Sequence, residues 1–369
     1  MRRRGLYLAG LLVLAVVAGL AWRFGAAAGL ALSLAAPGAE AWVPGLREQP
    51  LREEITLATE SGQLDADLHR PARPRGVLLL VHGLSRAGRR QPDVERLARL
   101  LAQHGLLVLV PQIEGLAAFR LTGREVDDIR AALRHAAALG TAMPGGSIGV
   151  AGLSFGAGPA MLAAAGVPGL RVVGSFGGYA DLRHVIAYVT TGAHDFEGRH
   201  HVQRQEEYNR WKLLALLVAL VADGEDRRVL DGIAGAKLAN PGEVTESMEQ
   251  RLGAEGRAVL ALVLNRREDA VDGLIAELPA AAREALRRLS PLAAVPRIQA
   301  RLLITHGTAD ESIPFTESLR LAAAAGGRAH LALFETFHHT GPRAFWPSLW
   351  PRARDGWRLV RVVDELLPR

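Results

Sequence analysis

The chain has 369 residues, of which 49% are hydrophobic and 22% are charged. This balance is typical of globular proteins and excludes disordered and collagen-like chains. The absence of cysteine excludes disulfide bonds, thiolate nucleophiles and cysteine-ligated metal sites. The formal charge is +6, but three arginines at positions 2 to 4 supply half of it and the others are mixed with acidic residues, so no nucleic-acid partner is expected.

Residues 1–40 are predicted to form a membrane anchor. The three arginines precede an uncharged run from Gly5 to Trp22, and a second uncharged run continues from Phe24 to Ala39. One helix through the first run, with Arg23 at the interface, has the length needed to cross a bilayer. Because positive charges tend to stay in the cytoplasm, everything after this segment is expected outside the cytoplasm, for example in a bacterial periplasm.

A cleaved signal peptide is the alternative for the same segment. A basic start and an apolar stretch are also its ingredients, and so are the small residues Ala35, Ala36, Ala39 and Ala41. The retained anchor is favoured because the apolar region exceeds the roughly 7 to 15 residues of a signal peptide's apolar stretch. Either interpretation exports the folded domain, membrane-anchored or secreted.

The chain after residue 50 is predicted to alternate strands with helices. It begins with a hairpin, Glu54–Thr59 and Gln63–His69, in which apolar residues alternate. The continuously apolar run Gly76–Val81 is typical of a strand buried on both faces of a parallel sheet. The elements that follow are Pro92–His104, Leu106–Val110, Arg124–Leu139, Ser147–Gly152, Gly156–Ala165 and Arg171–Ser175. This order predicts an α/β fold with a doubly wound, mostly parallel sheet.

The alternation stops from Leu182 to Ala300, where the periodicity is helical and no strand is evident. Strands and helices resume at Arg301–Thr305, Pro314–Ala325, Ala329–Phe334 and Ala344–Leu367. We therefore expect a core formed by residues 50–181 and 301–369, interrupted by a helical insertion, residues 182–300.

Ser154 is the predicted nucleophile. It lies in the segment Gly152-Leu153-Ser154-Phe155-Gly156, between an apolar strand and an alanine-rich helix. A serine on a tight turn from strand to helix is held in a strained conformation that exposes its hydroxyl, and small residues on both sides let strand and helix approach. The N-terminus of the helix also stabilises developing negative charge.

The amides of Leu84 and Phe155 are the predicted oxyanion donors. His82 and Gly83 end an apolar strand, and a turn at the glycine can direct the Leu84 amide toward an oxyanion. The Phe155 amide follows the nucleophile directly. We expect His82 itself to shape the loop.

The acid and the base are predicted after two later strands. Asp310 closes the segment Thr305–Asp310, at the carboxyl end of the strand that follows the insertion. The strand Leu331–Phe334 leads to His338 and His339. The chain order is therefore serine, aspartate, histidine.

With these segments in this order, the sequence resembles the α/β-hydrolase family over about residues 50 to 369. The resemblance implies acyl transfer without a metal or an organic cofactor. It matches five residues to roles: the nucleophile Ser154, the acid Asp310, the base His339, and the oxyanion donors Leu84 and Phe155. His339 would take the serine proton, Asp310 would fix the imidazole tautomer, and water would release the acyl group.

Two of these assignments have rivals. His338 adjoins His339, and the second is preferred because the family places its histidine about five residues past the strand. Asp181 follows an earlier strand from which some members of the family draw their acid. Its alternative role is to cap a helix.

The family often carries a helical cap over the nucleophile at the position of residues 182–300. Within this insertion, the run Leu213–Ala222 has ten uncharged residues, too few to cross a bilayer. A helix that is apolar on all sides is buried, so this one either packs the cap onto the core or forms a wall for an acyl chain or an interfacial surface.

Two polar clusters have weaker functional interpretations. A possible metal-binding run lacks a helical pair of histidines and is expected to be a solvated loop: His194, Asp195, Glu197, His200 and His201. Three arginines just past the oxyanion segment could hold a substrate carboxylate or phosphate, although a solvated surface is favoured: Arg86, Arg89 and Arg90.

The sequence thus predicts a serine hydrolase that cleaves small-molecule carboxylic esters with apolar acyl groups. An acyltransferase or a peptidase would use the same triad. A hydrolase-like domain without activity, held at the membrane as a binding module, is the alternative of another class. It is disfavoured because each member of the machinery is present in the sequence.

Overall fold

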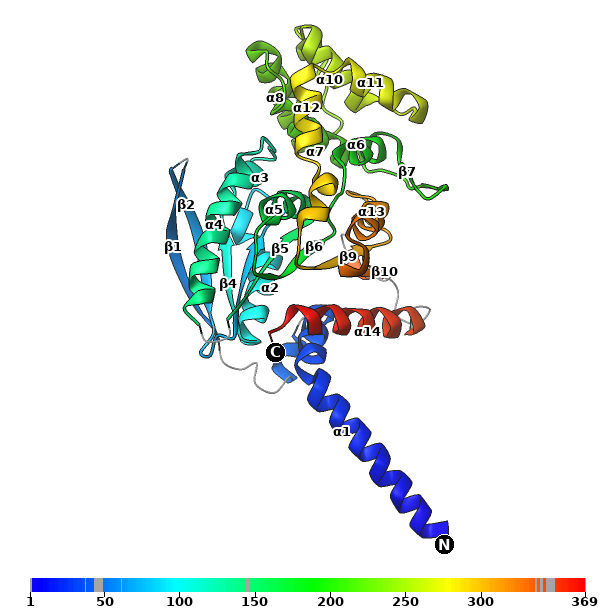
Figure 1. The fold of residues 1–369 in the computed structure, drawn as a ribbon. Helices are drawn as coiled ribbons and strands as arrows, with labels where there is room; N and C mark the ends of the chain where they lie inside the picture. The colour runs from blue at the N-terminus through cyan, green and yellow to red at the C-terminus, as the bar shows by residue number, and fades with distance from the viewer. Residues whose placement is uncertain are drawn as a thin grey trace.

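The computed structural model describes residues 2–36, 38–42, 49–60, 62–143, 146–335, 337–338, 341–342 and 349–368. A central eight-stranded sheet is covered by helices on both faces. In Figure 1 the helices of the insertion, coloured green to yellow, lie above the sheet, and α14 and the long helix α1 lie below it.

The eight strands of the sheet follow the order β1-β2-β4-β3-β5-β6-β9-β10. Their bounds are Leu51–Thr59 (β1), Gly62–Arg70 (β2), Gly76–Val81 (β3), Leu106–Pro111 (β4), Ser147–Leu153 (β5), Leu170–Phe176 (β6), Arg301–Gly307 (β9) and Ala329–Phe334 (β10). The pairings β1 with β2 and β2 with β4 are antiparallel, and every pairing from β4 to β10 is parallel. The predicted α/β fold with a mostly parallel sheet is confirmed.

The parallel strands are buried on both faces because a helical layer covers each side. In β3, Val77 and Leu79 belong to one core and Leu78 and Leu80 to the other. The first core lies under α4 (Arg124–Thr141), α5 (Ala157–Ala164) and α13 (Thr316–Ala325), and the second under α2 (Pro92–Gln103) and α14 (Leu349–Leu366). This two-sided burial explains the uninterrupted apolar run of β3.

The segment between β6 and β9 is mostly helical. Its helices are α6 (Leu182–Thr191), α7 (Glu207–Val218), α8 (Gly224–Ala239), α9 (Glu246–Glu249), α10 (Ala254–Leu264), α11 (Val271–Glu277) and α12 (Ala280–Arg288). A short 3-10 segment, Pro291–Arg297, leads back to the sheet. We refer to residues 182–290 as the cap.

The cap also contains a hairpin that our sequence analysis missed, β7 (Ala193–Phe196) with β8 (Arg199–Val202). Glu197 and Gly198 connect the strands with φ of +49° and +75°. Two positive φ values are the mark of a type I′ turn, whose twist matches that of a hairpin. The expectation of no strand was wrong here because strands of four residues, most of them polar or charged in β8, are too short to show alternation.

The N-terminal helix α1 (Arg2–Ala35) packs on the core with its C-terminal part. Ala27 and Leu30 are buried in the core beneath α14, and the ring of Phe24 lies 5.4 Å from that of Trp357. Arg23, expected at a membrane interface, instead forms an ion pair with Asp364 of α14. The run after Arg23 therefore contributes to the folded domain.

The predicted transmembrane helix is not supported by the structure. The side chains of residues 2–17 lie outside the described ones. Among the residues that are described, no helix has both the length and the apolar character needed to cross a membrane.

Candidate active site

Ser154 occupies a strained turn between β5 and α5. It begins a 3-10 turn, Ser154–Gly156, and has a φ of +50°, a conformation that residues with a side chain rarely adopt. A Cβ at Gly152 would lie 2.4 Å from the Cα of Ala157, and a Cβ at Gly156 would lie 2.1 Å from the carbonyl oxygen of His82. Both glycines are therefore required for strand, turn and helix to come this close.

The turn after β3 lies directly against Ser154. A Cβ at Gly83 would lie 3.0 Å from the Cβ of Ser154. β3 is the neighbour of β5 in the sheet, and the parallel strands end at the same edge. The sheet order thereby brings together two segments that lie about 70 residues apart in sequence.

His82 holds this turn in place. The imidazole is fully buried, with Nδ1 2.8 Å from the Gly83 carbonyl oxygen and Nε2 3.1 Å from the Ile113 amide nitrogen. Since Ile113 donates to Nε2, the proton resides on Nδ1 and is donated to the Gly83 carbonyl. Burial lowers the pKa of His82, which keeps the ring neutral.

This bond also orients the Leu84 amide. The Gly83 carbonyl and the Leu84 N–H belong to one trans peptide, so the N–H points away from His82. Within the described part of the chain, no acceptor takes a hydrogen bond from the Leu84 amide. The expectation that His82 shapes the loop agrees with these bonds, and the oxyanion roles of Leu84 and Phe155 stay predictions.

Asp310 lies at the same edge of the sheet, just after β9. Its Oδ1 accepts hydrogen bonds from the amides of Ser312, at 2.8 Å, and Ile313, at 3.1 Å. Its Oδ2 lies 3.7 Å from the position of a Cβ at Gly177, which follows β6. The carboxylate is therefore buried beside the end of the strand next to β5.

The predicted base cannot be placed. His339 lies outside the described residues, and so does the side chain of His338. The backbone of β11 (Phe337–His338) pairs with that of β12 (Gly341–Pro342). The choice between the two histidines stays a prediction.

The chain is similar in fold to proteins of known structure. No protein-family model and no curated protein matches the sequence. Among solved structures, the acylaminoacyl peptidase of Pyrococcus horikoshii superposes with a TM-score of 0.50 at 15% identity. The match covers 88% of this chain and 42% of that one, so the chain spans less than half of the peptidase. The protein has the α/β-hydrolase fold.

A second match is the esterase domain of a Rhodothermus marinus protein, with 16% identity and a TM-score of 0.46. The match covers 86% of this chain and 97% of that domain. In this α/β-hydrolase fold, the Ser154 turn and the predicted acid Asp310 follow β5 and β9, two parallel strands on either side of β6 that end at the same edge of the sheet.

Asp181, the alternative acid, has a structural role in this fold. It caps α6, since its Oδ1 accepts a hydrogen bond of 2.8 Å from the Arg183 amide. The hydroxyl of Ser290 lies 3.2 Å from the same oxygen and 3.0 Å from the Leu182 amide nitrogen. These bonds join the two ends of the cap, which agrees with the capping role.

Three side chains of the cap hold residues 309–311, which we call the acid loop because they include the predicted acid, Asp310. Tyr188 donates to the carbonyl of Asp310 at 2.6 Å, Gln203 to that of Ala309 at 3.3 Å, and Asn209 to that of Glu311 at 3.0 Å. Three successive carbonyls of the acid loop are thereby bound by α6, α7 and the segment between them. Sequence analysis did not find these residues, because each contact joins positions more than a hundred residues apart.

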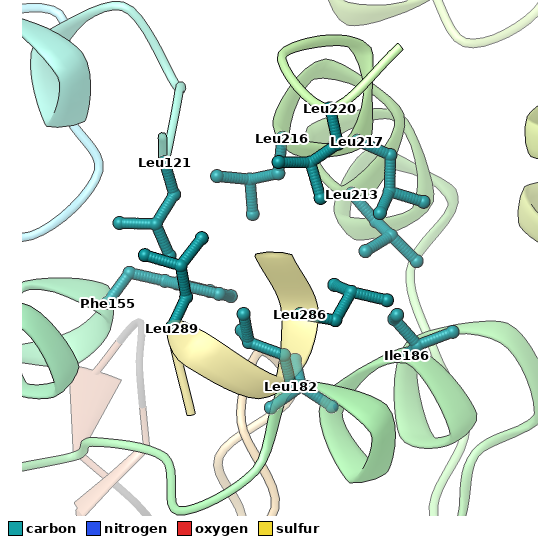
Figure 2. Close-up of a pocket in the computed structure, with 11 residues that line it drawn as sticks. Leu121, Phe155, Leu182, Ile186, Leu213, Leu216, Leu217, Leu220, Leu286 and Leu289 are labelled. Atoms are coloured by element: carbon teal, nitrogen blue, oxygen red, sulfur yellow. The ribbon is translucent and has the colours of Figure 1, made fainter. Parts of the chain in front are cut away.

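An apolar cavity lies between the cap and the core beside Phe155 (Figure 2). Phe155, which follows Ser154, forms part of its wall. Eleven residues line it: Leu121, Phe155, Leu182, Val185, Ile186, Leu213, Leu216, Leu217, Leu220, Leu286 and Leu289. Its volume is about 20 Å³, close to that of one water, so an acyl chain enters only when some of these side chains move. The run Leu213–Ala222 thus contributes a wall of this cavity.

Side chains of both polar clusters contact other side chains of the protein. His194 stacks on His201 with ring centres 5.0 Å apart, and the described residues contain no group of three metal-ligating side chains. Arg89 and Arg90 form ion pairs with the buried carboxylate of Asp67. Arg86 is exposed.

Proposed function

We propose that the protein is a serine hydrolase that cleaves carboxylic esters through an acyl-enzyme. The observation that carries the proposal is the strained turn at Ser154, with a φ of +50°, packed against the His82-Gly83 turn. The buried carboxylate of Asp310 at the same sheet edge adds to it. Strain of this kind is kept where it serves a function.

In the proposed reaction, His339 accepts the proton of Ser154 as the hydroxyl attacks the ester carbonyl. Asp310 holds the imidazole in the required tautomer. The amides of Leu84 and Phe155 stabilise the oxyanion, and the alcohol leaves with the proton. Water then attacks the acyl-enzyme by the same route in reverse and releases the acid.

The proposed substrate is a small ester with an apolar acyl group. The cavity beside Phe155 supports this, since all its described lining residues are apolar. A peptidase or an acyltransferase would share the triad. A peptidase would turn over an amide substrate, and an acyltransferase would transfer the acyl group to an added alcohol faster than to water.

Labelling with a fluorophosphonate probe tests the proposal. We expect the purified protein to be labelled, and Ser154→Ala and His339→Ala to abolish labelling, because the probe reacts only with an activated serine. His338→Ala should leave labelling intact. A folded wild-type protein that stays unlabelled would instead favour the non-catalytic binding module.

We further propose that the N-terminal segment exports the domain and holds it at the membrane. This proposal is supported by the N-terminal sequence, in which three arginines precede an uncharged run. The measurement is the activity of a reporter enzyme that folds only outside the cytoplasm, fused after residue 49. An inactive but stable fusion would refute export.

A further inference from the structure

The chain contains only two lysines, Lys212 and Lys237, although it has 44 basic residues. Both lie in the cap, and both are partly buried. The Nζ of Lys212 lies 5.0 Å from the ring centre of Tyr208, and the Nζ of Lys237 lies 5.0 Å from that of Trp211. Their local surroundings are therefore similar, but they lie on different helices.

Lys212 occupies the face of α7 that is directed toward the site. Asn209, Lys212, Leu213 and Leu216 follow one another at the spacing i, i+3, i+4 and i+7, which places them on one side of the helix. Asn209 binds the acid loop, and Leu213 and Leu216 line the apolar cavity. Lys212 thus shares this side of α7 with residues that contact the acid loop and the cavity, and its ammonium group lies at the ring of Tyr208.

The ammonium group of Lys212 has no ionic partner in the described part of the protein. No described carboxylate lies within the 4.0 Å of an ion pair, and Asp310 and Glu206 act on it only at longer range. Burial lowers the pKa of Lys212, while these two charges oppose that effect. A partly dehydrated cation is stabilised by an anion that replaces its lost water.

The Lys212 ammonium group lies near the protein surface, which indicates the side from which an anion reaches it. Tyr208, over which the ammonium lies, is 42% exposed, whereas the leucines of the cavity are buried except for the half-buried Leu220. A ligand that filled both places would put its apolar arm among the leucines and its charged group at the outer end of α7.

We propose that Lys212 binds a carboxylate of the substrate, so that the preferred substrate is an ester that carries a carboxylate together with an apolar arm. This inference rests on the proposed function and restricts its substrate class to esters that carry a carboxylate. Lys212 takes no part in proton transfer in this proposal and acts on substrate selection.

The test compares two esters of equal chain length, para-nitrophenyl pentanoate and the mono-para-nitrophenyl ester of glutaric acid. The second carries a carboxylate where the first has a methyl group. In the wild-type protein we expect a higher kcat/KM for the glutarate ester. Lys212→Met should lower the ratio of the two kcat/KM values by about tenfold, the usual size of a charge-assisted hydrogen bond. Lys212→Arg should retain part of the preference.

Lys237→Met is the matched control, because it removes the other cap lysine from a similar contact with an aromatic ring. It should leave the ratio unchanged. An unchanged ratio in Lys212→Met, or an equal change in Lys237→Met, would overturn the inference while the proposed esterase activity stood.

A binding measurement separates this inference from the proposed chemistry. Ser154→Ala removes the nucleophile, so calorimetry can follow the binding of either ester to this variant without turnover. We expect tighter binding of the glutarate ester, lost in the double variant with Lys212→Met. Equal affinities for the two esters would refute the inference even if the wild-type protein hydrolysed neither.

Discussion

At the scale of single residues, the nucleophile turn depends on the absence of two side chains. Gly156 lies where a Cβ would meet the carbonyl of His82, and backbone atoms have little freedom to move. The His82 carbonyl directly precedes Gly83, which packs against Ser154. The residue types at these positions therefore determine how closely Ser154 approaches the His82-Gly83 turn.

Gly156→Ala is expected to destabilise the fold and to slow fluorophosphonate labelling. The added methyl group would have to separate α5 from β3, at a cost of about 1 to 3 kcal/mol in the free energy of unfolding. Urea unfolding and the labelling rate are the measurements. Gly235→Ala, within α8 and with no atom near its Cβ position, is the control and should be neutral or stabilising. Equal behaviour of the two variants would contradict this account.

At the scale of elements, hydrogen bonds as well as apolar contacts join the cap to the sheet edge at which Ser154 and Asp310 lie. Tyr188, Gln203 and Asn209 each bind one carbonyl of the acid loop. A hydrogen bond between Asp181 and Ser290 joins the two ends of the cap where it meets the core. A cap held in this way positions Asp310, the predicted acid, in addition to covering the cavity.

Tyr188→Phe is expected to lower kcat by about tenfold with little effect on KM for a neutral ester, because a displaced acid loop weakens the support of the base. Tyr179→Phe is the matched control. It removes a buried hydroxyl that donates to the carbonyl of Leu289 at 3.1 Å, away from the acid. Both variants should lose similar stability in urea. A kcat that falls equally in both would mean that Tyr188 contributes only to folding.

At the scale of the whole molecule, several histidines are buried in the neutral form. Burial lowers the pKa of His69 and of His194 to about 4, and the pKa values of His82 and His104 are lowered by burial as well. His184 differs, because its bond to Glu317 outweighs burial and raises its pKa. Most of these groups therefore resist protonation in the folded state.

The free energy of unfolding is expected to fall as the pH drops from about 6.5 to about 4. In this range the unfolded chain binds protons at histidines that stay neutral when folded, and the state that binds more protons is favoured by acid. The total loss should be on the order of a few kcal/mol. Urea unfolding between pH 7 and pH 5 measures the slope. His69→Gln should reduce this slope, and His135→Gln is the control. Equal reductions of the slope in the two variants would contradict the role assigned to His69.

Much of the fold was predictable because its signals are local. The apolar run of β3 and the alternation of strands with helices indicated the parallel sheet, and the five residues around Ser154 indicated the turn. The β7–β8 hairpin was missed because its strands have four residues each. The second half of α1 was misjudged, since an uncharged helix suits a core as well as a membrane.

The sequence by itself determined the α/β class, the strained serine turn and the chain order of serine, aspartate and histidines, because each depends on neighbouring residues or on their order. Only the tertiary structure decided which distant groups meet. It brought Tyr188 and Asn209 to the acid loop, put Lys212 on the side of α7 that carries Asn209 and the cavity leucines, and paired Arg23 with Asp364. These contacts join residues remote in sequence, and packing of the whole chain determines them, so no local pattern records them.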